Sequence, residues 1–222
     1  MGAPMDSMSP VKGEPAAALL ARIVALYRAN AADQSARAAI LSRGAANLDG
    51  LASPRPQAVG RSLPVRRFLA RALSNVCGGS LADVAEAFAL AEPALAWRQN
   101  PNYSAQRMGP DFVDRYGYVE LIGPEGTFES RKLRVGFLLL GPYTVYPDHS
   151  HTAEEVYHVV SGRACWRRGD GAWRNEPPGA VIYHAPHVPH AMRTEDEPLL
   201  ALYCWMGDIT APADLLKGGR HG

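Results

Sequence analysis

Histidine and glutamate side chains gather in one short stretch of this sequence. Residues 146–162 read YPDHSHTAEEVYHVVSG, in which His149 and His151 stand two positions apart. Residues i and i+2 of a β-strand point to the same side, so the two imidazoles can reach one point. Glu155 opens the next predicted strand, and a short hairpin would bring its carboxylate there. The spacing predicts a shared site for these three side chains.

A second group of histidines follows downstream, in PPGAVIYHAPHVPHAM (177–192), which contains His184, His187 and His190. Three imidazoles and one carboxylate form a mixed nitrogen and oxygen site, which suits first-row transition metals and leaves positions open for water or substrate. A lone histidine is more often a surface or packed core residue, and one HxH pair is a weak signal. The two segments together favour a metal site, but the spacing leaves open which downstream histidine joins it.

The first half of the chain, which must support this site, has a helical pattern. Residues 1–100 contain 25 alanines, against 10 in the rest of the chain. Apolar residues recur at helical spacing over Leu19–Tyr27, and this stripe needs a partner surface in the same chain or in another copy. A second helix is predicted over Leu63–Val76, and a third from Ser80, whose hydroxyl would cap its first turn. The Gly-, Pro- and Asn-rich segments 44–61 and 98–110 predict loops.

The second half has the pattern of a β protein. Short apolar runs recur at intervals of about 8–12 residues with turn signals such as Gly141-Pro142 between them, which is typical of a sandwich or barrel. The predicted strands are Tyr118–Ile122, Leu133–Leu140, Glu155–Val160, Ala164–Arg168, Ala180–Tyr183 and Leu199–Trp205.

Composition excludes several classes of protein. The 222 residues carry 23 basic and 22 acidic side chains, a net charge of +1, whereas a nucleic-acid-binding domain usually has a basic excess. The three widely spaced cysteines form no disulfide framework and fit a reducing compartment. No apolar run approaches the ~20 residues of a membrane span, and the first ten residues lack the features of a secretion signal. We therefore expect a cytoplasmic protein.

The two histidine segments resemble a known pair of motifs. The run His149, His151, Glu155, Gly162 is similar to the first cupin motif, and Pro178-Gly179 through His190 is similar to the second. The resemblance implies a mainly β fold: a cupin double-stranded β-helix (jelly-roll) barrel over residues 106–222, behind an α-helical N-terminal extension over residues 1–105.

The resemblance also implies a ligand set. His149, His151, Glu155 and His190 would hold one divalent transition metal, which could be Fe, Mn, Zn, Co or Ni. His187 is expected in an exposed turn and His184 beside the ligands. Strand alternation is expected to turn His158 away from the metal. Gly141 lies slightly farther before His149 than is usual in the family, which concerns the entry loop and not the ligands.

A wider similarity narrows the chemistry. The Ala-rich helical extension followed by HSHTAEEVYHVVSG, IYHAPHVPHAMRT and PLLALYCWMGDI resembles the cupin-type dimethylsulfoniopropionate (DMSP) lyases, most of all the DddL type. The resemblance implies metal-dependent cleavage of DMSP to dimethyl sulfide and acrylate. Tyr157, on the same strand face as Glu155, would abstract the α-proton as its phenolate. Tyr146 would contact the substrate, because a sulfonium without N–H donors is best held by aromatic faces. On strand statistics alone, Tyr157 would instead be an aromatic core residue of the strand.

Three other functions fit the same ligand set. An Fe(II) dioxygenase would use the four ligands to activate oxygen, and a metal-dependent isomerase would act on another small carboxylate. A non-catalytic small-molecule-binding cupin usually lacks one or more ligands, whereas this sequence has all four. The helical half could act as a cover for one barrel face, a lid or a dimer element. A homodimer is expected by resemblance, since cupins often dimerise.

Overall fold

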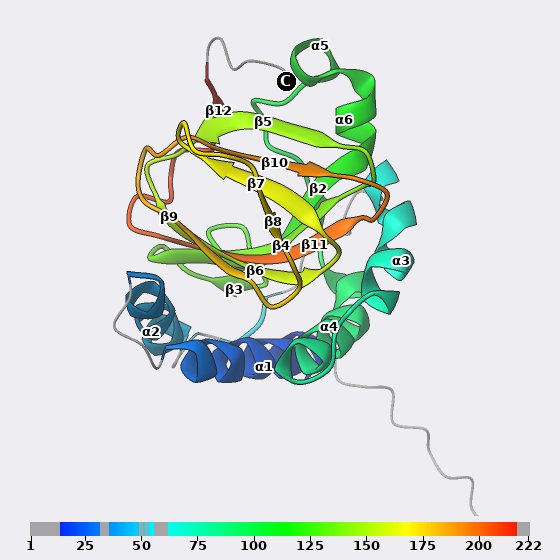
Figure 1. Ribbon diagram of the computed structural model, residues 1–222. Coiled ribbons are helices and arrows are strands. Elements are labelled where there is room, and N and C mark those ends of the chain that lie inside the picture. Colours follow the sequence, from blue (N-terminus) through cyan, green and yellow to red (C-terminus); the bar gives the residue numbers. More distant parts are fainter. Residues whose placement is uncertain (1–13, 32–35, 49–50, 52, 56–61, 217–222) are drawn as a thin grey trace, which may run out of the picture.

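The computed structural model describes residues 14–31, 36–48, 51, 53–55 and 62–216. Helix and strand make up 34% and 33% of the described residues. The fold is therefore mixed, and the expectation of a mainly β protein underestimates the helical half. The three longest helices lie beneath a pair of facing β-sheets, and shorter helices lie beside and above the sheets (Figure 1).

The helices lie mostly in the first half of the chain. Two short 3₁₀ turns, Pro64–Phe68 and Glu92–Ala94, precede and follow members of this group. The α-helices are α1 (Glu14–Asn30), α2 (Ala36–Leu48), α3 (Leu69–Ser74), α4 (Ser80–Ala91), α5 (Ala105–Met108) and α6 (Pro110–Arg115).

Within the described residues the strands form a seven-stranded and a five-stranded sheet. The larger sheet has the order β1-β2-β4-β11-β6-β9 with β3 beside β2, and the smaller has the order β12-β5-β10-β7-β8. The strands are β1 (Trp97–Arg98), β2 (Tyr116–Gly123), β3 (Phe128–Glu129), β4 (Leu133–Leu140), β5 (Val145–Ser150), β6 (Glu154–Ser161), β7 (Ala164–Arg168), β8 (Arg174–Glu176), β9 (Val181–His184), β10 (His190–Thr194), β11 (Leu199–Met206) and β12 (Asp214–Leu215).

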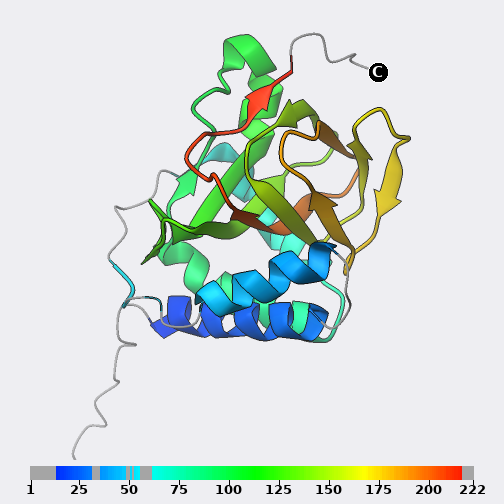
Figure 2. The ribbon, with the colours of Figure 1, turned by 90° about the vertical axis from the view of Figure 1, so that its left-hand side faces the viewer.

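Helices α1, α2 and α4 form a layer, here called the helical layer, that covers the outer face of the larger sheet, as Figures 1 and 2 both show. Leu19, Ile23 and Tyr27 of α1 are fully buried, in one apolar cluster with strand residues such as Val156 and Leu202. Burying a large apolar side chain contributes about 1.5–3 kcal/mol. The apolar stripe of α1 is thus satisfied within the same chain.

Most predicted strands are confirmed to within one or two residues, but parts of the helical half differ. The loop predicted over 44–61 is wrong at its start, because α2 continues to Leu48. The segment 98–110 contains α5 and part of β1. Gly79, not Ser80, precedes the first turn of α4, and no side chain caps that turn. The helix expected over Leu63–Val76 is a 3₁₀ turn followed by α3.

Two further expectations concern membrane-spanning segments and the division of the chain into two parts. Among the described helices, none combines the length and apolar character that crossing a bilayer requires. The division of the chain at residue 105 stays a prediction.

Candidate metal centre and substrate pocket

The register of the larger sheet places one row of functional side chains across four strands. Arg134 of β4 is the Cα partner of Trp205 of β11, which in turn is the partner of Glu155 of β6. Glu155 is also the partner of His184 of β9. Because side chains alternate along a strand, Tyr157 faces the same side as Glu155, between the sheets. Adjacent strands thus hold these groups at fixed spacings.

Three of the predicted ligands meet between the two sheets. The Nε2 atom of His151 lies 3.0 Å from Oε2 of Glu155, and Nε2 of His190 lies 3.2 Å from the same oxygen. One ligand atom from each residue falls within 4.8 Å of the others, and all three residues are buried. The expected hairpin is wrong, because β5 and β6 lie in different sheets. His151 lies in the short connection between these two strands, Glu155 lies near the start of β6, and His190 begins β10. Of the three downstream histidines, the structure brings His190 into this close group.

Backbone carbonyls orient these imidazoles. Nδ1 of His151 lies 2.9 Å from the carbonyl oxygen of Ala153, and Nδ1 of His190 lies 3.0 Å from that of Val188. A proton on Nδ1 donates to the carbonyl and leaves the Nε2 lone pair free toward Glu155. Two Nε2 atoms and one carboxylate oxygen fit a first-row transition metal of the expected kind.

The charges at this centre depend on one another. Burial acts to raise the pKa of the Glu155 carboxyl, but His151 and His190 hold that pKa well below its usual range. Burial acts to lower the pKa of His151, yet the charge of Glu155 and their hydrogen bond raise it. Each charge therefore favours the charged form of its partner. A metal ion would displace the proton of His151, so metal binding competes with protons.

His149, the fourth predicted ligand, lies beside this group and outside its 4.8 Å limit. Its ring stacks on Tyr146, with centroids 3.9 Å apart, and meets the His190 ring edge-on at 4.1 Å. Its Nδ1 lies 2.9 Å from the carbonyl oxygen of Pro147. Burial lowers the pKa of His149 well below its usual value, so the ring is neutral and its Nε2 can act as a ligand.

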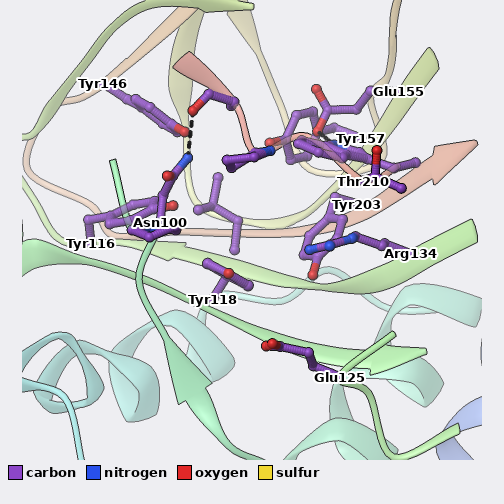
Figure 3. Close-up of a pocket in the computed structure, with 15 residues that line it drawn as sticks. Asn100, Tyr116, Tyr118, Glu125, Arg134, Tyr146, Glu155, Tyr157, Tyr203 and Thr210 are labelled. Carbon is purple, nitrogen blue, oxygen red and sulfur yellow. Dashed lines mark hydrogen bonds between the residues drawn. The ribbon is translucent and has the colours of Figure 1, made fainter. Parts of the chain in front are cut away.

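A pocket of about 220 Å³ opens beside the metal centre. Figure 3 shows Tyr116 and Tyr146 toward one end of it and Glu155 with Tyr157 toward the other. The Tyr146 hydroxyl lies 3.0 Å from that of Tyr103. The lining of the pocket is rich in aromatic rings: Tyr116, Tyr118, Tyr146, Tyr157, Tyr203 and Trp205.

Burial controls the acidity of these phenols. It raises the pKa of Tyr157 well above its usual value, and the nearby charge of Glu155 raises it further. Tyr146 is shifted in the same direction, first by burial. Both phenols are therefore protonated in the protein alone, and a phenolate at Tyr157 requires a cation close by.

Two lining residues were not predicted from the sequence. Arg134 enters from β4, where its Nη1 donates to Glu120 at 3.2 Å. Asn100 lies in a segment predicted to be a loop, and its Nδ2 donates to the carbonyl oxygen of Ala213 at 2.9 Å. Neither residue carries a local sequence signal, since the sheet register and a loop contact bring them to the pocket.

The remaining histidines lie as their positions suggested. His187 is exposed, with a positive φ of 62° in the turn before β10. His184 is buried and stacks on His190, with centroids 3.9 Å apart. His158 points away from the pocket and stacks on Tyr27 of the helical layer.

Facing sheets that enclose a buried group of histidines and glutamate define a metal-binding class of protein. A family model described as dimethylsulfoniopropionate lyase matches residues 33–201. The chain belongs to the DMSP lyase family.

Individual relatives agree with this family. The chain is 37% identical over 132 residues to dimethylsulfoniopropionate lyase DddQ of Ruegeria pomeroyi, a match covering 59% of this chain and 65% of the relative. It is 34% identical over 146 residues to putative dimethylsulfoniopropionate lyase DddL of Cereibacter sphaeroides, covering 65% and 60%. The matches thus span less than two thirds of the length of these curated relatives.

Solved structures give a longer match. A chain from the crystal structures of the DMSP lyases RdDddP and RnDddQII superposes with a TM-score of 0.75 and 27% identity, covering 92% of this chain and 98% of that one. DMSP lyase DddQ from Ruegeria pomeroyi gives a TM-score of 0.72 and 29% identity, covering 89% and 95%.

Proposed function

We propose that this protein is a metal-dependent carbon–sulfur lyase that cleaves DMSP into dimethyl sulfide and acrylate. One observation carries the proposal beyond family membership: Tyr157 lines the same pocket as Glu155 and shares its strand face. A proton-accepting group thus lies beside the group that would hold the metal.

The metal site is proposed to consist of His149, His151, Glu155 and His190. The close triad supports three of these ligands, and the neutral ring of His149, stacked against His190, supports the fourth. When bound, a divalent metal such as Fe, Mn, Zn, Co or Ni supplies a Lewis acid that polarises the substrate carboxylate.

Tyr157 is proposed as the general base. Its phenolate takes the α-proton of DMSP, the α-carbon electrons form the new C=C bond, and the C–S bond breaks with its electron pair on sulfur. The products are acrylate and neutral dimethyl sulfide, with the proton left on the Tyr157 oxygen. Its buried position keeps water from competing for this proton.

The aromatic end of the pocket is proposed to hold the sulfonium. Tyr146 is 4% exposed and lines the pocket with Tyr116. Ring faces attract a cation that has no N–H donors, by about 0.5–2 kcal/mol each. Tyr146 is therefore assigned to substrate binding.

Several finer features belong to the same proposal. The two sheets would close as a cupin jelly-roll barrel, and two copies would form a homodimer. The DddL subtype is a proposal from the sequence motifs alone, because the identities of 37% to DddQ and 34% to DddL do not separate the two.

The test is headspace gas chromatography of purified, metal-loaded protein with DMSP, beside a chelated control. We expect metal-dependent release of dimethyl sulfide with an equal amount of acrylate. Absence of release with Fe, Mn, Zn, Co and Ni would reject the lyase. Oxygen uptake or isomerised product would then identify a dioxygenase or an isomerase, and binding without turnover a non-catalytic cupin.

A further inference from the structure

Two oxygens of one carboxylate have different partners at the metal centre. Oε2 of Glu155 faces Nε2 of His151 at 3.0 Å and Nε2 of His190 at 3.2 Å. Oε1 accepts a hydrogen bond from the indole Nε1 of Trp205 at 2.5 Å. The indole therefore occupies the oxygen that points away from the imidazoles.

Trp205 also contacts a second member of the triad. Its ring centroid lies 4.1 Å from that of His151, with the planes at 32°. The backbone fixes this arrangement, since Trp205 and Glu155 are Cα partners on β11 and β6. One side chain thus holds the carboxylate rotamer by a hydrogen bond and one imidazole by packing.

Trp166, the other tryptophan beside this site, differs from Trp205 in its hydrogen bonding. Trp166 of β7 is 3% exposed and lies against Tyr157 and His184. Its Nε1 is buried and has no hydrogen-bond partner within the described part of the chain. A buried indole at this site can therefore pack without donating a hydrogen bond. The indole of Trp205, in contrast, donates to Glu155, a proposed metal ligand.

We propose that Trp205 is a positioning residue for the metal: its indole N–H binds Oε1 of Glu155 and so presents Oε2 as a single ligand oxygen beside Nε2 of His151 and His190. This inference rests on the metal site of the proposed function. Outer partners that hold a ligand in place typically change metal affinity by 10–100-fold when they are removed.

The test measures Co(II) binding, which does not depend on turnover. Trp205→Phe keeps an aromatic ring but removes the N–H donor. We expect its dissociation constant for Co(II), from competition with a chromophoric chelator, to rise at least 10-fold. The visible absorption bands of bound Co(II) should shift as well, because the carboxylate is free to rotate or to bind through both oxygens. A merely structural role would leave these bands unchanged.

The matched control is Trp97→Phe. Nε1 of Trp97 donates to a carboxylate oxygen of Glu92 at the same distance, 2.5 Å, away from the metal centre. Its loss should leave Co(II) affinity and spectrum within twofold of wild type. If Trp205→Phe fails to fold, 3-benzothienylalanine at position 205 replaces the N–H by sulfur in a ring of the same shape, and should reproduce the weaker binding.

The outcomes separate this inference from the lyase. Wild-type affinity and spectrum in the position 205 variants would overturn the role of Trp205. A wild-type protein that binds no Co(II) would overturn the metal site and this inference together. Weakened Co(II) binding in Trp205→Phe would support the inference even if no dimethyl sulfide is released, a result that rejects only the lyase.

Discussion

Tyr27 and His158 lie face to face where the first helix meets the larger sheet, with ring centroids 5.6 Å apart and planes at 20°. Both rings are buried, and neither His158 nitrogen has a hydrogen-bond partner among the described residues. A charged imidazole here would have no solvation, so burial lowers the pKa of His158 to about 4. The contact between the helical layer and the sheet therefore depends on a neutral histidine.

This arrangement predicts acid-sensitive stability. An unfolded histidine takes up its proton near pH 6.5, whereas folded His158 does so only near pH 4. The unfolded state thus binds more protons in this range, and stability present above pH 6.5 is lost as the pH falls toward 4. We expect His158 to account for about 2–3 kcal/mol of the loss between pH 7.5 and 4.5.

Urea unfolding of chelated wild type and His158→Phe at both pH values checks this expectation. The variant keeps a ring against Tyr27 but cannot titrate, so its free energy of unfolding should fall by about 2–3 kcal/mol less than that of wild type. Equal losses in the two proteins would show that other groups set the acid sensitivity.

Substitution of the proposed base should separate chemistry from metal binding. Tyr157→Phe keeps the ring and loses the hydroxyl, so we expect unchanged metal content and dimethyl sulfide release lowered by about 10²–10⁴-fold. Tyr183→Phe is the matched control, since Tyr183 is not among the residues that line the pocket. Turnover near wild type in Tyr157→Phe would assign the proton transfer to another group.

The choice among the downstream histidines can be tested by metal analysis. His190→Ala removes one of the three clustered ligand atoms, and we expect loss of both bound metal and activity. His187→Ala removes an exposed imidazole on the turn before the same strand and should retain both. A fully metallated His190→Ala variant would show that His190 is not a ligand and that another histidine completes the metal site.

The glycine of the first motif has a steric requirement that stability measurements can check. Gly162 has φ of 80°, and a Cβ atom there would lie 2.0 Å from the carbonyl oxygen of Pro198. Gly162→Ala should therefore lower the free energy of unfolding by at least about 2 kcal/mol. Gly79 has a similar φ of 78° but nothing within 4 Å, so Gly79→Ala should cost only about 1 kcal/mol. Equal losses of unfolding free energy in Gly162→Ala and Gly79→Ala would rule out the clash with Pro198 as the cause.

Local patterns were sufficient where the chemistry depends on spacing along the chain. The spacing of His151 and Glu155 predicted that these two side chains meet, although through a hairpin that is wrong because β5 and β6 lie in different sheets. The alternation along β6 predicted that His158 turns away. The structure brings His151 and Glu155 together and points His158 toward α1.

Features that depend on pairing between distant segments were not predictable in the same way. Arg134 and Trp205 join the row of Glu155 only through the register of β4, β11 and β6, which no local pattern encodes. The sequence analysis did not predict α2, and one reason is that Gly44 and Asn47 are typical loop residues. It is held by tertiary packing, since Ile40 is fully buried in the common core.

Both faces of strand β6 are occupied, one by the pocket and the other by the apolar core. Glu155 and Tyr157 project toward the pocket, while Val156 and Val160 pack in the apolar core shared with the helices. A one-residue slip of β6 against β11 and β9 would exchange these two sets, placing a carboxylate under the helices and valines at the metal centre. This protein should therefore tolerate substitutions in the pocket wall far better than a residue inserted or deleted within β6.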